Sequence, residues 1–216
     1  MPEVKFCGLT RAADARMATD LGARYVGVIR AGGPRSLGLD AARAVLDGAG
    51  AGPRRVGVFG AAPPDVIGAE AADLGLDIVQ LHGDPTVQMV AAVRGHFAGA
   101  VWAACRVSGA ELPPNATALA SVADGIVLDR RSARGLGGTG ETLPWAELAP
   151  AVASLRSLAT LVLAGGLRPD NLQEAIRLMS PDVVDVSSGV ESAPGVKDHE
   201  RMREFAAAVT AREVIA

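Results

Sequence analysis

Lys5 and Cys7 lie two residues apart in the stretch KFCGLT near the start of the chain. Alternate side chains of an extended segment share a face, so the ammonium group and the thiol point the same way. A thiol acts as a base or nucleophile only as its thiolate, and a neighbouring cation favours that form. The stretch therefore predicts a reactive polar face. As alternatives, a buried cysteine often packs as a small apolar residue, and Lys5 could serve only as an ion-pair partner.

Further ionisable side chains stand at the ends of other apolar stretches. His82 follows IVQL, Asp129 ends GIVLD, and Asp185 shares one face of VVDVS with Ser187. Burying such groups is costly unless they are paired or used chemically, so their repeated position predicts a functional site. The alternative is that Asp129 and His82 are turn residues, since loops rich in glycine or proline follow them.

Two glycine-rich stretches predict a phosphate-binding site. LAGGLRPDN contains Gly165 and Gly166, and VSSGVE contains Ser188 and Gly189. Glycines let backbone N–H groups approach a dianion closely, and the loops after the last two strands bind phosphate in many eight-stranded α/β barrels. The alternative is that both stretches are simple tight turns.

The segment 130–145, RRSARGLGGTGETLPW, is the longest stretch without a helix or strand pattern. It follows Asp129 directly and contains several glycines, Gly138 among them, that suit a loop able to close over a substrate and exclude water. Its position beside an ionisable strand end favours that role over a surface loop without function.

The elements that must position these residues repeat along the chain. Eight short, valine-rich runs are predicted strands, at 4–7, 25–29, 55–59, 77–81, 100–104, 125–129, 160–164 and 183–187. Most are followed by apolar residues spaced three and four apart, which predicts amphipathic helices, although two prolines at 113–114 predict a shortened fifth helix. The alternation favours a closed (β/α)8 TIM barrel of the α/β class, as a single domain over residues 1–216. A doubly wound open sheet is the alternative, but no GxGxxG motif follows the first strand.

The composition narrows the class of protein. The 216 residues are 49% hydrophobic and only 3% aromatic, which is typical of a tightly wound α/β protein. A net charge of −3 argues against nucleic acid and anionic membranes as partners, and no apolar run approaches the roughly 18 residues of a spanning helix. Cys7 and Cys105 show no metal-ligand spacing, so no metal site or disulfide framework is predicted, and Cys105 is expected to pack. We expect a cytoplasmic protein.

Taken together, the motifs resemble one known family. KFCGLT, QLHGD, VLDR with GLGGTGETLPW, LAGGLRPDN, VDVSSGVE and the closing PGVKDHERMREF look like the phosphoribosylanthranilate isomerases of tryptophan biosynthesis. The resemblance runs in register over nearly the whole chain, and KxCG, GGTG and SSGVE are specific in combination where each alone would be weak.

The resemblance implies an activity as well as a TIM barrel. The implied reaction is an Amadori rearrangement, in which N-(5'-phosphoribosyl)anthranilate becomes an open-chain aminoketose without a metal or cofactor. Cys7 would be the base and Asp129 the acid, so the thiol needs a lowered pKa and the carboxyl group a raised one. We expect Lys5 to favour the Cys7 thiolate and the closed loop to desolvate Asp129.

By the same resemblance, Arg35 binds the anthranilate carboxylate, because a guanidinium group meets a carboxylate with two parallel hydrogen bonds. The loop departs from the family pattern, with Gly33 in place of a serine and Ser36 in place of a bulkier residue, and Arg30 is an alternative. The residues expected to bind or position the substrate are Lys5, Arg35, His82, Gly138 and Asp185, with Gly165, Gly166, Ser188 and Gly189 at its phosphate.

Two other functions stay open at this point. Another phosphosugar isomerase or epimerase would share the barrel and the phosphate site, but the bifunctional isomerase that also serves histidine synthesis uses an aspartate where this chain has Cys7. A non-catalytic phosphometabolite-binding barrel would keep the glycine loops and lose turnover. In each case the expected partner is a small phosphorylated molecule, and the expected assembly is a monomer or a homodimer.

Overall fold

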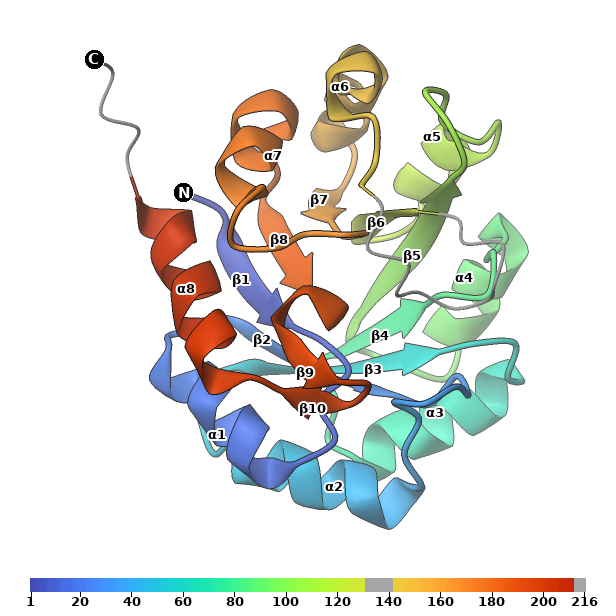
Figure 1. Cartoon of the computed structure of the whole chain (residues 1–216). Helices are drawn as coiled ribbons and strands as arrows, with labels where there is room; N and C mark the ends of the chain where they lie inside the picture. Colours follow the sequence, from blue (N-terminus) through green and yellow to red (C-terminus); the bar gives the residue numbers. More distant parts are fainter. Residues whose placement is uncertain (131–141, 212–216) are drawn as a thin grey trace.

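The eight valine-rich runs form a closed parallel barrel in the computed structural model, which describes residues 1–130 and 142–211 (Figure 1). Each strand pairs with its neighbours in chain order, and the last pairs with the first. The strands are β1 Glu3–Phe6, β2 Tyr25–Ile29, β3 Arg54–Phe59, β4 Ile78–Leu81, β5 Ala100–Val107, β6 Gly125–Arg130, β7 Thr160–Leu163 and β8 Val183–Val186. The predicted TIM barrel is confirmed, and the open-sheet alternative is wrong.

Helices follow the strands and surround the barrel (Figure 1). They are α1 Ala12–Asp20, α2 Leu39–Gly48, α3 Pro64–Asp73, α4 Val87–Arg94, α5 Ala116–Ala120, α6 Trp145–Ala153, α7 Leu172–Met179 and α8 His199–Thr210. Helix α5 is the shortest of these, as the preceding pair of prolines predicted, since proline cannot donate a backbone hydrogen bond. Between β8 and α8 the chain adds a 3-10 turn, Ser188–Val190, and a hairpin of β9 Glu191–Ala193 and β10 Val196–Lys197.

Alternation along the strands divides the apolar side chains between two cores. Outward-facing residues pack against the helices, and inward-facing residues fill the barrel. In the inner core, the rings of Tyr25 and Trp102 meet edge to face at a centroid distance of 5.1 Å. The next inward positions along β4, β6 and β8 are the polar residues Gln80, Asp129 and Asp185. The barrel interior therefore changes from apolar to polar toward the carboxyl ends of its strands.

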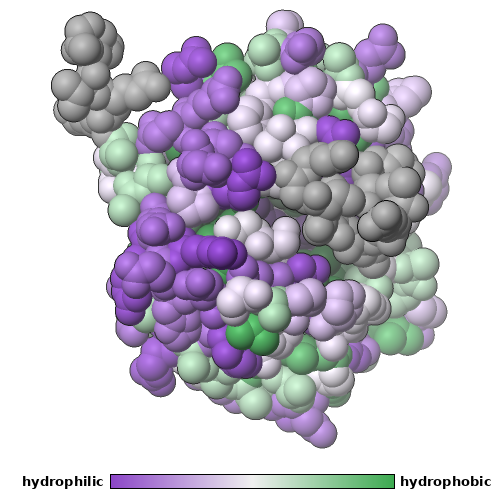
Figure 2. All heavy atoms as spheres, in the orientation of Figure 1, coloured by the Kyte–Doolittle hydropathy of each residue, from purple (hydrophilic) through white to green (hydrophobic). Residues whose placement is uncertain are grey.

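The described surface carries few large apolar side chains. Those exposed are Met1, Val66 and Leu158, at 94%, 42% and 45% of their surface, and they lie far apart in the chain. Hydrophilic side chains gather over α8 (Figure 2). In residues 1–130 and 142–211, no helix is both long and apolar enough to cross a membrane.

Candidate active site

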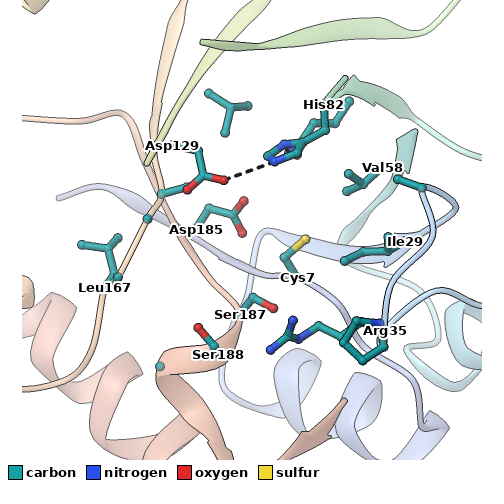
Figure 3. A pocket seen from close by; sticks show the side chains of 18 of the residues that line it. Cys7, Ile29, Arg35, Val58, His82, Asp129, Leu167, Asp185, Ser187 and Ser188 are labelled. Carbon is teal, nitrogen blue, oxygen red and sulfur yellow. Dashed lines mark hydrogen bonds and ion pairs between the residues drawn. The ribbon is translucent and has the colours of Figure 1, made fainter. Parts of the chain in front are cut away.

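The carboxyl ends of the barrel strands surround a pocket (Figure 3). Its lining includes most of the predicted site residues: Cys7, Arg35, His82, Asp129, Gly165, Gly166, Asp185, Ser188 and Gly189. Lys5 is fully buried and is not part of this lining. Gly138 and the predicted closing loop fall on residues 131–141, outside the described residues. Residues spread over the whole chain thus meet in one place, as the strand-end positions predicted.

Lys5 and Asp185 form a buried ion pair. They are direct neighbours in the register of β1 and β8, and Lys5 Nζ donates to Asp185 Oδ2 at 2.8 Å. Burial by itself would lower the pKa of Lys5, but the negative charges of Asp185 and Cys7 outweigh it, so this pKa is raised. Among the described residues, Asp185 Oδ1 has no hydrogen-bond partner, which leaves it able to accept one from a substrate hydroxyl.

Gly27 of β2 makes room for Lys5 and Cys7. A β-carbon at this position would lie 3.2 Å from Cys7 Sγ and 3.4 Å from Lys5 Nζ, so both groups face the same space, as their alternate positions predicted. Burial raises the pKa of Cys7, the charge of Lys5 lowers it, and Asp185 raises it, with a raised pKa as the result. Lys5 therefore acts in the expected direction, but it does not outweigh burial.

Asp129 is connected to His82 and, through it, to Gln80. Asp129 Oδ2 lies 3.2 Å from His82 Nε2, and His82 Nδ1 lies 3.4 Å from Gln80 Nε2 (Figure 3). When the Gln80 amide donates a hydrogen bond to Nδ1, the imidazole carries its hydrogen on Nε2. This N–H then donates a hydrogen bond to Asp129. His82 is therefore placed to orient the Asp129 carboxyl group, which a residue that only formed a turn would not do.

Gly165 lies against the other oxygen of Asp129. It has a φ of +81°, and a β-carbon there would lie 2.9 Å from Asp129 Oδ1 and 2.8 Å from the backbone nitrogen of Arg130. That nitrogen donates to Asp129 Oδ1 at 2.8 Å. Glycine is thus required at this position both for its backbone conformation and for the space that the carboxyl group occupies.

The two glycine-rich loops predicted to bind phosphate pack directly on each other. A β-carbon on Gly189 would lie 1.9 Å from the carbonyl oxygen of Leu167, so the loop after β8 touches the loop after β7 backbone to backbone. In the β7 loop, Gly166 has a φ of +74°, and its carbonyl accepts a 2.9 Å hydrogen bond from Asn171 Nδ2. Ser188 belongs to the same pocket wall. The glycines of this joint wall leave room for an anion to approach the backbone.

Arg35 lines the pocket and is held by Glu191. Its Nε and Nη2 donate to the two carboxylate oxygens of Glu191 at 2.8 and 2.7 Å. Gly8 of the KFCG motif lies beneath it: with a φ of +64°, a β-carbon on Gly8 would come within 2.8 Å of Arg35 Cδ and 2.9 Å of Ser187 Oγ. The glycine after Cys7 therefore lets Arg35 cross the end of β1.

Sequence reasoning missed Glu191 and Lys197, which support this arginine. Both side chains are buried, and Lys197 Nζ donates to Glu191 Oε1 at 2.9 Å. The signal available in the sequence was that both stretches, SSGVE and PGVKD, contain charged residues. Arg30 is bound to Glu70 and is not part of the pocket lining. Cys105 is 2% exposed, and burial raises its pKa to about 12, in keeping with the expected packing role.

Comparisons with known proteins identify the family to which the chain is similar. Residues 4–208 match the family described as N-(5'phosphoribosyl)anthranilate (PRA) isomerase. The N-(5'-phosphoribosyl)anthranilate isomerase of Paracoccus denitrificans is 40% identical, over 96% of this chain and 97% of its own. The phosphoribosyl anthranilate isomerase of Thermus thermophilus has a similar structure, with a TM-score of 0.84 and 35% identity over 96% and 98% of the two chains.

A second solved structure is a phosphoribosyl anthranilate isomerase in complex with reduced 1-(o-carboxyphenylamino)-1-deoxyribulose 5-phosphate. It is 31% identical, with a TM-score of 0.82 over 95% of this chain and 97% of its own. Matches of this length and identity bear out the resemblance carried by KFCGLT, GGTG and SSGVE. The chain belongs to the N-(5'-phosphoribosyl)anthranilate isomerase family.

Proposed function

We propose that Cys7 is the general base and Asp129 the general acid of the isomerase reaction. The chain is a phosphoribosylanthranilate isomerase of tryptophan biosynthesis, whose substrate is N-(5'-phosphoribosyl)anthranilate. The observation that carries the assignment is that a thiol directly after β1 and a carboxyl group on β6 line the same pocket as the two glycine-rich loops. A base and an acid on different strands can reach different atoms of one small substrate.

The reaction needs one proton delivered and one removed. Asp129 protonates the ribose ring oxygen as the C1–O bond breaks, and the anilino nitrogen lone pair forms the C1=N bond of an iminium ion. The Cys7 thiolate then removes the proton from C2, and the electrons of the C–H bond form an enolamine. Protonation of the enolamine at C1 and loss of the hydroxyl proton at C2 give the ketone, 1-(2-carboxyphenylamino)-1-deoxyribulose 5-phosphate.

The base must be a thiolate during this reaction. Burial raises the pKa of Cys7, and the positive charges of Lys5 and Lys197 oppose this effect. A base with a raised pKa removes a carbon-bound proton better than a weaker base would, at the cost of a smaller ionised fraction. Lys5 thus supports catalysis from beneath the pocket, acting through Cys7 and Asp185.

The substrate's two anionic groups bind different sets of residues in the pocket. The phosphate binds the loops that contain Gly165, Gly166, Ser188 and Gly189, whose backbones pack together. The aryl carboxylate binds Arg35, whose described hydrogen bonds to Glu191 use Nε and Nη2, so Nη1 remains for the substrate.

The remaining contacts act on the sugar. His82 orients Asp129, and Asp185 accepts a hydrogen bond from a ribose hydroxyl through Oδ1. Gly138 and its loop are proposed to close over the substrate.

We further propose that residues 1–216 form a single domain and that the enzyme is cytoplasmic. We also propose that it works as a monomer or a homodimer. Light scattering of the purified protein tests this oligomeric state.

The catalytic assignment is tested with substrate generated in situ, followed through the loss of its fluorescence. Cys7→Ala and Asp129→Asn should each lower kcat by at least about a hundredfold, because general acid–base catalysis contributes that much. Cys105→Ala and Asp124→Asn are matched controls, since Cys105 is buried away from the pocket and Asp124 precedes β6 at its opposite end. A folded Cys7→Ala or Asp129→Asn variant with the activity of its control would contradict the assignment.

A further inference from the structure

Lysine is rare in this chain, and both copies are buried beside the active site. Of the 21 lysines and arginines only two are lysines, Lys5 and Lys197. Both side chains have 0% exposed surface. Arginine supplies all the other strongly basic side chains, so the compact ammonium group with its three donors is confined to two enclosed positions. Lys5 has a partner in Asp185, which leaves the place of Lys197 to be explained.

Lys197 reaches the site from outside the barrel. It lies in β10, and its Nζ donates to Glu191 Oε1 at 2.9 Å, to the carbonyl oxygen of Ser187 at 3.0 Å and to Ser187 Oγ at 3.4 Å. These contacts match the three donors of an ammonium group. The β9–β10 hairpin thus ties the end of β8 to a residue that is not part of any barrel strand.

Glu191 lies between two cations. Its Oε1 accepts from both Lys197 Nζ and Arg35 Nε, and its Oε2 accepts from Arg35 Nη2 at 2.7 Å. Its side chain is 5% exposed, so these bonds are poorly screened by water. Two positive charges and one negative charge leave this cluster with a net positive charge at the pocket wall. That balance suits a substrate carboxylate.

The cluster is fixed against the pocket by close packing. Arg35 Cδ and Ser187 Oγ would both lie within 3.0 Å of a β-carbon on Gly8, at 2.8 and 2.9 Å. Figure 3 shows the Arg35 guanidinium group extending toward Ser187 and Ser188. A shift of Glu191 would therefore move Arg35 directly, because the arginine has no free space on the side of Gly8.

We propose that Lys197 is a positioning residue, which holds Glu191 and thereby fixes the guanidinium group of Arg35 for the aryl carboxylate of the substrate. The inference rests on the proposed role of Arg35 as the residue that binds this carboxylate. It assigns the PGVKD stretch a role in binding the substrate, in addition to the effect of the Lys197 charge on Cys7.

Lys197 also acts on Cys7 through its charge. The charged groups that influence Cys7 in the described structure are Lys5, Lys197 and Arg35, which are positive, and Asp185, which is negative. Burial lowers the pKa of Lys197, and Glu191 opposes this shift. Removing the ammonium group takes away one of the charges that favour the Cys7 thiolate. The pKa of Cys7 should then rise.

Lys197→Met tests the proposal, because methionine keeps an unbranched stem without the charge. We expect KM to rise about tenfold, since Arg35 loses its alignment for a charge-assisted bond. The ascending limb of the pH profile of kcat/KM should move to higher pH, so that activity recovers in alkaline solution. A purely structural role would not move this limb. Arg203→Met, which removes a 53% exposed charge on α8, should leave both quantities unchanged.

A double-mutant cycle shows whether Lys197 acts through Glu191. Glu191→Gln should raise KM by itself, and adding Lys197→Met should then cost less than about twofold more, because the shared contact is already weakened. Additive losses would overturn the proposal. If Lys197→Met does not fold, Glu191→Gln in the otherwise unchanged chain tests the same contact through KM.

Arg35→Lys separates this inference from the proposed function. If Arg35→Lys raises KM but a folded Lys197→Met leaves both KM and the pH profile unchanged, the role of Arg35 stands and the role of Lys197 is overturned. If Arg35→Lys itself leaves KM unchanged, the proposed role of Arg35 and the role of Lys197 that rests on it are both overturned.

Discussion

Gly165 and Asp129 are packed so closely that no side chain fits between them. A β-carbon on Gly165 would lie 2.9 Å from Asp129 Oδ1. This contact links the loop proposed to bind the phosphate to the residue proposed to protonate the ribose ring oxygen.

Gly165→Ala should therefore lower kcat by about a hundredfold, because a shift of about 1 Å in a catalytic group has an effect of that order. The matched control is Gly22→Ala: Gly22 has a similar φ of +76° but has no atom within 4 Å of its β-carbon position. The control should lose about 1 kcal/mol of stability through its backbone and keep its kcat. Steady-state kinetics measure kcat for the two variants. Equal kcat values would contradict the predicted effect of the Gly165–Asp129 contact on catalysis.

Gly189→Ala should weaken phosphate binding, because its β-carbon would lie 1.9 Å from the Leu167 carbonyl oxygen and force the two loops apart. We expect KM, and the inhibition constant of inorganic phosphate, to rise about tenfold as backbone contacts to the anion are lost. Gly109→Ala is the control, since nothing lies within 4 Å of its β-carbon position. Unchanged phosphate inhibition in Gly189→Ala would exclude these loops as the phosphate site.

Lys5→Met should destabilise the protein by about 3–5 kcal/mol, because it leaves the buried Asp185 carboxylate without its cation. The double variant Lys5→Met with Asp185→Leu removes both charges and should recover most of that loss. Both variants should be inactive. Urea unfolding measures the free energies, and losses that simply add would show that the ion pair does not couple the two residues.

Asp14, which is not part of the pocket lining, makes stability depend on pH. Its buried carboxylate accepts hydrogen bonds from Arg11 at 2.8 and 2.7 Å and lies 2.9 Å from His199 Nε2. Burial raises the pKa of Asp14, but the bonds from Arg11 and His199 outweigh it, so this pKa is lowered. The unfolded chain then binds more protons near pH 4, so the contribution of Asp14 is complete above its unfolded pKa of about 3.9 and is lost as pH falls through the folded value.

Asp14→Asn should accordingly cost about 2 kcal/mol at pH 7. Its unfolding free energy should approach that of the unmodified protein only once pH falls below the lowered folded pKa of Asp14, where the carboxylate is protonated in both states. Asp65→Asn, an exposed residue in the first turn of α3, is the control and should change stability little at any pH. A cost that stays the same at low pH would show that the effect is steric.

Much of the fold and part of the site could be predicted from the sequence, because they depend on patterns of residues close together in the chain. Strand alternation is local, so the sequence alone predicted that Lys5 and Cys7 share a face and that Asp129 and Asp185 end strands at the site. Closure of the barrel follows from repeating one unit eight times. The pocket residues then meet because parallel strands bring all their carboxyl ends to one edge.

The parts that could not be predicted depend on contacts between distant segments. Arg35 and Glu191 are 156 positions apart, and no spacing rule connects them. The hairpin that carries Lys197 is too short for a periodic pattern. Gly27 looked like an ordinary strand residue, since its role depends on which residues of β1 lie beside it. The direction in which Lys5 shifts the pKa of Cys7 was predicted. The larger, opposite effect of burial on this pKa could be seen only in the packed structure.

The two buried lysines also determine how the folded protein responds to reagents directed at primary amines. Neither lysine side chain is exposed, so amine-directed reagents should leave both lysines of the folded protein unmodified. A lysine-specific protease would find its cleavage sites at residues 5 and 197 covered until the barrel opens. The rate of such digestion would therefore measure opening of the native protein directly, without any added label.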